Sequence, residues 1–307
     1  MIKSITVTNP RDESLEMVLT DPEKSGFVIT EITGLNPPKA EINSTELVTG
    51  NGAVFNSSRM TSRNIVITMK YLRSPSIEQC REKSYRYFPI SHKIRLTIKT
   101  DLRSCYIDGY VESNEAVIFS SQAYTQISII CPQPALLDVM KDTNIFSGIE
   151  PVFEFPIENN GVEFVIDDPL EFSLHLDRDV LNVVYTGEID NGCRIFLNFL
   201  DPVKNIRIWN YYKHGTTGGM YIDTDKVAKI IGSPIDTGDE ILINTIDGEK
   251  KIVCIHDGIE YNILNCINKK ADWIQLTMGN NTICYSVEEG RHNMHMRIEN
   301  DILLQGV

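Results

Sequence analysis

The stretch Thr237-Gly-Asp-Glu-Ile-Leu-Ile-Asn-Thr-Ile-Asp-Gly-Glu-Lys-Lys-Ile-Val-Cys-Ile255 decides the fold class of this chain. Two runs rich in β-forming residues, 240–246 and 249–255, flank the pair Asp247-Gly248. A two-residue hairpin turn of the mirror-image type needs positive φ at both central positions, and Asp-Gly supplies it. The stretch therefore predicts a tight antiparallel hairpin.

Further short β runs separated by turn residues fill the second half of the chain. Turn residues include Gly238, Asp239, Gly279 and Asn281, and the runs span 162–166, 171–176, 182–185, 193–199, 205–212, 219–223, 272–278 and 282–287. Many short strands without helices are typical of an antiparallel β-sandwich.

The first half combines runs of alternating apolar and polar residues with one helix. The runs span 2–8, 14–20, 27–33, 39–47, 64–72, 93–100, 104–112 and 124–131. Ser74 suits a helix cap and Pro75 the first helical position, and Ile77, Cys80 and Ser84 recur near helical spacing. Eight strands and one helix predict a β barrel or roll closed by a helix.

Prolines mark the junction between two domains. Pro132, Pro134, Pro151 and Pro156 surround the polar run 141–144. A chain of 307 residues is long enough for two cores. We predict a mainly β protein with an N-terminal domain at 1–131, an inter-domain segment at 132–157 and a β-sandwich domain at 158–307.

The charge of the chain is concentrated in its second half. The net charge is −13; 16 basic and 18 acidic residues give −2 for 1–157, and 13 basic and 24 acidic residues give −11 for 158–307. Proteins that hold DNA or anionic lipid need clustered Lys and Arg. The composition therefore argues against adhesion to either, although DNA can still slide past such a surface.

The cysteines and the N-terminus point to a reducing compartment. Seven scattered cysteines without CxxC spacing predict buried, reduced thiols. The start of the sequence lacks the apolar region of a signal peptide, and no run reaches the length of a membrane span. We expect a product made in the cytoplasm without membrane insertion.

Candidate metal and phosphate motifs have simpler interpretations. His292 and His295 lie three apart in a β-like pattern, which places them on opposite sheet faces. Asp223-Thr-Asp225 lacks the downstream ligands of a calcium loop and fits a solvated strand end. His214-Gly-Thr-Thr-Gly-Gly219 lacks the lysine and helix of a phosphate loop and fits a long hairpin turn. We expect no metal and no cofactor.

Catalytic motifs are equally weak. Adjacent acids such as Asp167-Asp168 and Glu288-Glu289 point apart on a strand or turn, whereas glycoside hydrolysis needs two carboxyl groups flanking one bond. No serine stands in a nucleophile-elbow pattern. We predict that the protein is not an enzyme.

Two further features concern binding. Trp209, Tyr211 and Tyr212 could form an aromatic platform for a sugar ring, although such residues usually fill a core or an interface. Gly26 and Gly34 bracket the strand at 27–33, and a second strand and a Gly- and Asn-rich segment follow it. That segment predicts an exposed loop or arm that needs a partner surface.

In order and spacing, three groups of segments resemble the distal tail proteins of long-tailed phages, over almost the entire chain. The first runs from Gly26-Phe-Val-Ile-Thr-Glu-Ile-Thr-Gly34 to Arg63-Asn-Ile-Val-Ile-Thr-Met-Lys-Tyr-Leu72 and the helix after it. The second is Ile127-Ser-Ile-Ile-Cys-Pro-Gln-Pro-Ala-Leu-Leu-Asp138, with Cys131, Pro132 and Pro134 where that family has them. The third comprises Thr216-Thr-Gly218, Gly238 to Gly248, Asp272-Trp273 and Gly279 to Tyr285.

The resemblance implies a structural protein. In that family six copies form a ring, with the first domains as a belt around a central channel and galectin-like sandwiches projecting outward. It implies contacts with the tail tube protein and with a tail-tip or baseplate protein, a receptor-binding protein as a further partner, and DNA as a transient occupant of the channel. It places the protein at the distal end of a phage or tailocin tail.

Two other functions remain open from the sequence. One is a carbohydrate-binding module with Trp209, Tyr211 and Tyr212 as its platform, and the other is a glycosidase. Family members that bind sugar themselves usually carry an inserted domain, for which 158–307 has little room. The sequence therefore favours a hub that delegates receptor contact to another tail protein.

Overall fold

The structure is a computed structural model that describes residues 1–47, 49–73, 76–119, 122–145, 147–151, 173–177, 180–214 and 218–307. The chain divides into two compact units, Met1–Met140 with Leu303–Val307, and Lys141–Ile302. The chain thus passes from the first unit to the second inside strand β10 and returns inside strand β23. The predicted segment 132–157 lies partly outside the described residues.

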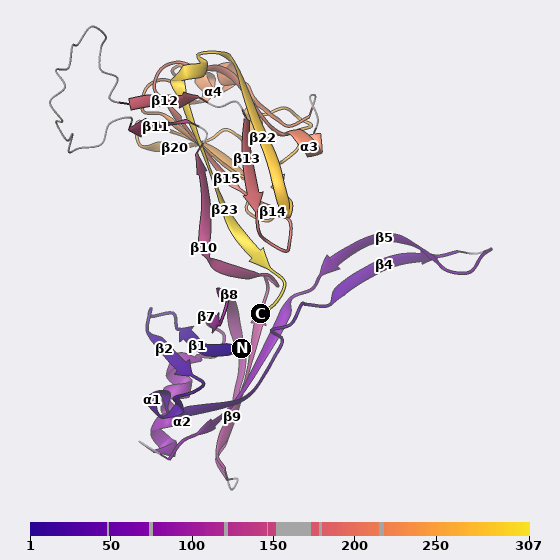
Figure 1. The fold of residues 1–307 in the computed structure, drawn as a ribbon, viewed down its shortest axis with the longest axis vertical. Helices are drawn as coiled ribbons and strands as arrows, with labels where there is room; N and C mark the ends of the chain where they lie inside the picture. The colour runs from indigo at the N-terminus through magenta and orange to yellow at the C-terminus, as the bar shows by residue number, and fades with distance from the viewer. Residues whose placement is uncertain are drawn as a thin grey trace, which may run out of the picture. The chain divides into compact units, whose positions relative to one another are not determined.

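The first unit is a curled antiparallel sheet with one longer helix (Figure 1). Its strands pair in the order β2-β1-β7-β8-β9-β6-β3. Strand β8 pairs with β7 from Ser104 to Tyr110 and with β9 from Tyr110 to Val117, with a bulge between Val111 and Ser113. The elements are β1 (Ile2–Thr8), β2 (Ser14–Val18), α1 (Pro22–Ser25), β3 (Phe27–Thr33), β4 (Ala40–Glu46), β5 (Ala53–Met60), β6 (Arg63–Tyr71), α2 (Ile77–Tyr87), β7 (Lys93–Thr100), β8 (Ser104–Val117), β9 (Tyr124–Cys131) and β10 (Leu136–Ile145).

Helix α2 lies where the sequence predicted it, but it begins with a different cap. Ser76 is its N-cap, and the Ser76 hydroxyl accepts a hydrogen bond from the Gln79 amide. The predicted cap Ser74 and the predicted first residue Pro75 lie outside the described residues. The helix buries Cys80 and Ser84, as its spacing predicted.

The second unit is a sandwich of two antiparallel sheets. One sheet runs β23-β15-β18-β19-β20 and the other β13-β22-β16-β17. The elements are β11 (Ser147–Pro151), β12 (Ser173–Asp177), β13 (Val180–Tyr185), β14 (Asn191–Gly192), β15 (Arg194–Phe199), β16 (Lys204–Asn210), α3 (Tyr211–His214), β17 (Met220–Ile222), α4 (Thr224–Ile231), β18 (Glu240–Asn244), β19 (Lys251–His256), β20 (Ile259–Asn262), η1 (Leu264–Cys266), β21 (Gln275–Leu276), β22 (Gly279–Glu289), η2 (Arg291–Asn293) and β23 (Met294–Leu304). Side chains from both sheets form one buried core, among them Ile195, Ile241, Ile206, Ile208 and Ile283. The predicted mainly β fold is therefore confirmed.

The hairpin around Asp247-Gly248 forms, but its predicted two-residue turn is wrong. β18 and β19 pair up to Asn244 opposite Lys251, so six residues connect them. Only Gly248 of the central pair has positive φ, and the Glu249 amide donates to the Ile246 carbonyl, as in a type II turn. At the end of β18, the amide and the hydroxyl of Thr245 both bond the backbone of Cys193, which continues the pairing with β15 by one residue.

The prediction of a second half without helices is also wrong. Asp223 caps helix α4, because its carboxylate accepts a hydrogen bond from the Lys226 amide at 3.1 Å. Gly232 ends the helix in the left-handed conformation with φ of 91°. The acidic run that resembled a solvated strand end is thus the start of a helix.

Candidate interaction surfaces

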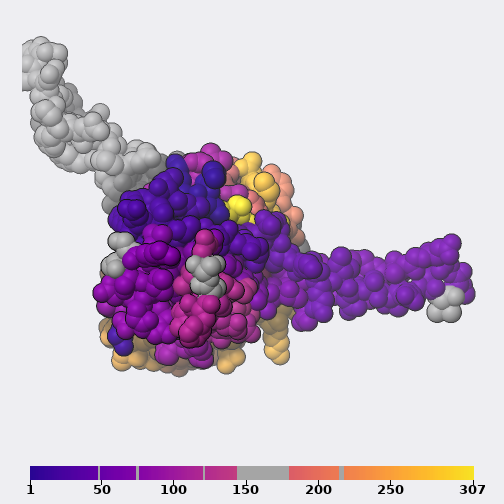
Figure 2. Space-filling view, turned by 90° about the horizontal axis from the view of Figure 1, so that it is seen from below, coloured from indigo at the N-terminus to yellow at the C-terminus, as the bar shows by residue number. Residues whose placement is uncertain are grey.

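The hairpin of β4 and β5 projects from the first unit, and we call it the arm (Figure 2). All residues of both strands are exposed. The sequence predicted a strand over 39–47 followed by an exposed loop or arm, and the arm is confirmed. Its return half is also a strand, which the sequence analysis missed.

Gly34 sets the point where the chain leaves β3 for the arm. Its φ is 84°, and a Cβ there would collide with the carbonyl oxygen of Asn64 on β6. Only glycine combines that conformation with such a close approach. The predicted role of Gly34 as a turn residue therefore has a definite structural reason.

The register of the arm places its largest apolar side chains on one face. Ala40 lies opposite Met60, Ile42 opposite Ser58, and Ser44 opposite Phe55. Because directly paired residues share a face and alternate residues return to it, Met60, Ile42 and Phe55 point the same way. Ile42 and Phe55 are 66% and 62% exposed. We call this surface the apolar face of the arm. Ala40 lies at one end of it and Ala53 at the other, and the smaller or polar side chains on the same face are Ser44, Ser58 and Glu46.

The opposite face of the arm is mostly polar. Glu41 pairs with Arg59 by an ion pair of 2.7 Å, and Asn56, the extra residue of a bulge, donates to the Thr45 hydroxyl at 2.7 Å. Val54 is the one large apolar side chain on this face among the described strand residues. The two faces therefore differ in chemistry although both are open to solvent.

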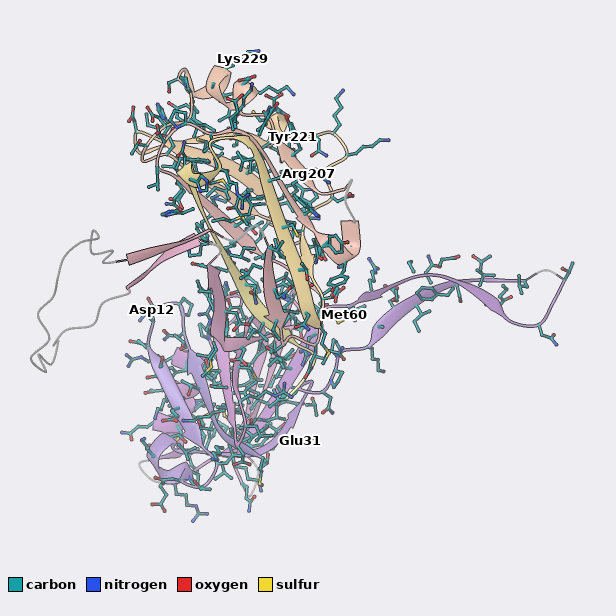
Figure 3. The ribbon with its side chains drawn as sticks, turned by 45° about the horizontal axis from the view of Figure 1, so that its top comes forward. Asp12, Glu31, Met60, Arg207, Tyr221 and Lys229 are labelled. Atoms are coloured by element: carbon teal, nitrogen blue, oxygen red, sulfur yellow. The ribbon has the colours of Figure 1, made fainter. Side chains whose placement is uncertain are left out.

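The second candidate surface is the outer face of the sheet β13-β22-β16-β17. Trp209 lies opposite Cys284, which lies opposite Val180, so these three side chains form a row across three strands. Arg207 in the next row lies between Ser286 and Tyr221 (Figure 3). The alternate residues of β16 are buried in the sandwich core, which confirms that this row faces outward.

A hollow of about 300 Å³ lies beside Trp209 on this face. Val180, Trp209, Ser286 and Arg291 contribute to its lining, together with Cys284, Tyr285 and Val287 of β22. The Arg207 guanidinium stacks over the indole ring at 4.6 Å and is held there by two hydrogen bonds to the Gly218 carbonyl, at 3.3 and 2.7 Å. We call this site the Trp209 hollow.

The predicted three-ring platform does not form a single surface. Tyr211 and Tyr212 lie in α3 with ring centroids 5.8 Å apart and ring planes at 83°. Two perpendicular rings do not stack on one sugar face, and neither tyrosine lines the hollow. Of the three predicted residues, Trp209 alone belongs to a concave site.

The structure brings together a Ser-His-Asp arrangement that the sequence analysis missed. His256 Nδ1 lies 2.7 Å from the Asp239 carboxylate, and its Nε2 lies 3.1 Å from the Ser233 hydroxyl. The hydrogen bond that the imidazole donates to the Asp239 carboxylate raises the pKa of His256. In hydrolases with such a trio, the backbone amide of the residue after the serine usually donates a hydrogen bond to the oxyanion. Here that residue is Pro234, which has no amide hydrogen to donate. We interpret the trio as a tie between the turn at 236–239, β19 and the end of α4.

The predicted turn glycines differ in what they do. Positive φ is found at Gly26, Gly34, Gly238, Gly248 and Gly279, whereas at the loop after α3 it is Gly219 and not Gly218 that adopts it. Gly218 instead supplies the carbonyl that holds Arg207.

The other predicted turn and linker residues serve as structural ties. Asn281 is 1% exposed, and its amide bonds the backbone of Thr277 and Gly279. Trp273 packs against the core beneath the Lys250 ammonium, which in turn pairs with Asp247.

Cys131 ends β9 opposite Arg63, and the stretch from Pro132 to Pro134 connects β9 to β10. All seven cysteines are buried and free of disulfides, as predicted. Burial raises the pKa of the Cys193 thiol to about 12, so that thiol is not a nucleophile at neutral pH.

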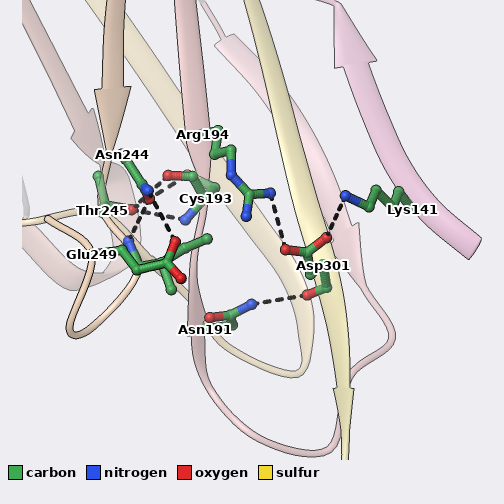
Figure 4. Close-up of polar contacts among 9 residues, drawn as sticks. Lys141, Asn191, Cys193, Arg194, Asn244, Thr245, Glu249 and Asp301 are labelled. Carbon is green, nitrogen blue, oxygen red and sulfur yellow. Dashed lines mark hydrogen bonds and ion pairs between the residues drawn. The ribbon is translucent and has the colours of Figure 1, made fainter. Parts of the chain in front are cut away.

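Asp301 ties the start of the second unit to its end (Figure 4). Its carboxylate pairs with Lys141 at 3.2 Å and with Arg194 at 2.9 Å, and its carbonyl accepts a hydrogen bond from Asn191 at 3.0 Å. The carboxylate is 10% exposed, so both partners neutralise a mostly buried charge.

The remaining motifs provide no reactive centre in the part of the chain that is described. His292 lies in η2 and His295 in β23, and no group of three or more His, Cys, Asp or Glu side chains within the described ranges could hold a metal ion. Among these same residues, no helix has both the length and the apolar character that crossing a bilayer requires. Asp167-Asp168 and Thr216-Thr217 lie outside the described residues.

The fold defines a class of two-unit β proteins in which a curled sheet with an arm is joined to an antiparallel sandwich. No protein-family model and no curated protein matches the sequence. Among solved structures, the chain is similar to the SPP1 Dit protein, described as a paradigm of the hub adsorption apparatus in phages that infect Gram-positive hosts. The identity is 13%, the TM-score is 0.61, and the match covers 97% of this chain and 99% of that one.

Two further structures belong to phage P2 baseplates in the activated conformation, one with Ca and one with Sr. Each is 8% identical to this chain. The match to the structure with Ca covers 98% of each of the two chains at a TM-score of 0.46, and the match to the structure with Sr covers 97% of each at a TM-score of 0.43. The similarity to the SPP1 protein spans the whole chain. The resemblance to distal tail proteins found in the sequence is therefore confirmed at the level of the fold.

Proposed function

We propose that this protein is a structural component of a phage or tailocin tail. Six copies form a ring that joins the tail tube to the baseplate or tail tip and leaves a central channel for DNA. The full-length match to the fold of a phage hub protein supports this proposal. The exposed apolar face of the arm is the observation that supports assembly of the copies into a ring.

The arm is built for contact with another molecule. Phe55 and Ile42 remain well over half exposed in the isolated chain, which leaves apolar area in water that burial would stabilise by roughly 25 cal/mol per Å². The sheet of the first unit also ends at β2 and β3, each paired on one side alone among the described strands. An arm and free sheet edges on one chain suit head-to-tail contact between copies.

The proposed partners follow from a place in the tail. One side of the ring contacts the tail tube protein, the other contacts a tail-tip or baseplate hub protein, and a receptor-binding protein docks on the ring or the sandwich. The protein is made in the host cytoplasm and ends in the distal tail of the virion. In this function it makes and breaks no covalent bond.

The charge supports transient passage of DNA through the ring. Each phosphate neutralised by Lys or Arg adds affinity and would slow transit. A net charge of −13 leaves the chain without the excess of positive charge that binds DNA tightly.

Mass measurement by light scattering tests the assembly. Six chains of 34.8 kDa give about 209 kDa. We expect Phe55→Asp to dissociate the ring, because a carboxylate on the apolar face would be buried without a partner. Val54→Asp is the matched control, since it adds the same charge to the neighbouring residue on the opposite face, and it should leave the mass unchanged.

Two outcomes would contradict the proposal. A wild-type protein that stays monomeric at high concentration would refute the ring. Equal behaviour of the Phe55→Asp and Val54→Asp variants would refute the role of the apolar face. Electron microscopy of the isolated protein should reveal a ring with a central hole.

A further inference from the structure

We propose that the Trp209 hollow binds a neutral hexopyranose, the six-membered ring form of a hexose. This inference does not depend on ring formation, because the hollow lies entirely within the second unit. It assigns a ligand class to a site for which the fold alone gives none.

The floor of the hollow suits the apolar face of a sugar. The row Trp209, Cys284 and Val180 is apolar, and it is fixed by the register of three paired strands. Val180 is 48% exposed, whereas Cys284 is 5% exposed beneath its neighbours. The C–H groups on one face of a pyranose stack on such an aromatic and aliphatic floor.

The indole is held in place before any ligand arrives. The Arg207 guanidinium lies over the ring at 4.6 Å, and its Nε and Nη2 both donate to the Gly218 carbonyl. Holding an aromatic side chain in its binding orientation lowers the ordering cost of association. Arg207 itself does not line the hollow, so the stacked guanidinium supports the indole without filling the site.

Polar groups at the edge suit the hydroxyls of a sugar. Ser286 and Arg291 both contribute to the lining of the hollow. An apolar floor with polar groups at its edge matches the two-sided chemistry of a pyranose.

Charge and size exclude the main alternatives. Residues 158–307 carry a net charge of −11, which disfavours nucleic acid and other polyanions. The volume of about 300 Å³ lies at the lower end of the roughly 300–1,000 Å³ that ligand sites occupy, which suits a single sugar ring. One stacking contact with a few hydrogen bonds should give a dissociation constant on the order of 1 mM.

The two tryptophans of the chain allow a direct test. Trp209 and Trp273 are the only ones in the sequence, so a Trp273→Phe variant reports fluorescence from Trp209 alone. Titration of this variant with glucose, galactose and N-acetylglucosamine up to about 100 mM should give a saturable change in emission for at least one sugar. Glycerol at equal concentration controls for viscosity and refractive index.

A second measurement uses unlabelled sugar and two alanine variants. Saturation-transfer NMR should detect the bound sugar with wild-type protein, and Trp209→Ala should weaken binding at least tenfold. Tyr211→Ala removes an exposed aromatic side chain outside the hollow and should bind as wild type does. Thermal melting of each variant confirms that it is folded.

Defined results would overturn the inference. One is the absence of both an emission change and saturation transfer with all three sugars. Another is an equal emission change in a Trp209→Phe variant, which keeps only Trp273. A third is that uridine, and none of the sugars, changes the emission. A negative result here leaves the mass of the wild-type assembly unaffected, so failure of the sugar site and failure of the ring are distinguishable.

Discussion

Replacement of Arg63 by methionine should destabilise the first unit. Arg63 is 3% exposed, and its guanidinium donates to the carbonyls of Gly34 at 3.0 Å, Leu35 at 3.2 Å and Gln305 at 2.6 Å. It therefore joins the base of the arm to the C-terminal segment, which the chain adds to the first unit after completing the second.

The magnitude follows from what the substitution removes and what it relieves. Hydrogen bonds to a charged group contribute about 1.5–3 kcal/mol each, so three of them set an upper bound of about 5–9 kcal/mol. Burial lowers the pKa of Arg63, which means that holding the guanidinium charged inside the protein has a cost that methionine removes. Methionine also fills part of the space, and we expect a net loss of about 2–4 kcal/mol.

Calorimetry and hydrogen exchange check this prediction. A loss of that size lowers the melting temperature of the first unit by about 6–15 °C, at a few degrees per kcal/mol. The Val307 amide, which donates to the Leu35 carbonyl at 3.3 Å, should exchange faster in the variant. Arg59→Met on the arm is the control, because its ion pair with Glu41 is exposed and contributes less than about 1 kcal/mol. A melting temperature within 1 °C of wild type, with unchanged protection of Val307, would refute the reasoning.

Two further predictions concern single positions. Gly34→Ala should lower the free energy of unfolding in urea by about 2–4 kcal/mol, because positive φ costs about 1–2 kcal/mol and the new methyl group collides with the Asn64 carbonyl. Gly248→Ala is the control: Gly248 also has positive φ but lies in open space, so the loss should be only about 1 kcal/mol. Equal losses in the two variants would contradict this. The contact with Asp239 raises the pKa of His256, so its contribution to stability should be complete below the ordinary pKa of about 6.5 and should disappear as pH rises through the raised value. His256→Gln should flatten the melting temperature between pH 6 and 9, and an unchanged slope would contradict the assignment.

Local patterns in the sequence were sufficient to predict most of the fold. Alternation over 64–72 predicted β6 to within one residue at each end, because one side of that strand is buried at Ile65, Ile67 and Met69. Helical spacing located α2 because Cys80 and Ser84 both face the core. Patterns of this kind succeed where burial repeats with the period of the backbone.

Predictions failed where a partner distant in sequence decides the local structure. Thr245 follows the last paired residue of its hairpin strand, and its hydroxyl bonds the backbone of Cys193, 52 residues away. The contact of His256 with Asp239 and Ser233 joins residues from a turn, a helix end and a strand, which only the fold brings together. The helix after Asp223 was missed for a different reason, since eight residues are too few for helical spacing to stand out from a strand pattern.

The apolar face of the arm was missed for a further reason, and it bears on the proposed ring. Its members come from two strands, and the bulge at Asn56 shifts Phe55 onto the same face as Ile42, so alternation along either strand alone does not identify the surface. A two-stranded hairpin with no core of its own is marginal in water. In the proposed ring a neighbouring copy would cover the apolar face of the arm and so stabilise the hairpin, and each chain offers one arm.

In the proposed assembly, every copy gives one arm and receives one, which is the heterologous contact that either closes into a ring or grows without limit. Closure after six copies leaves no apolar face uncovered, whereas an open chain leaves one at its end and invites aggregation. Wild-type protein that has dissociated on dilution exposes this face. Under the same conditions the Phe55→Asp variant should therefore aggregate less than the wild type. If that variant instead aggregates while the wild type remains dispersed, the apolar face serves the stability of the single chain and the argument for ring closure by the arm fails.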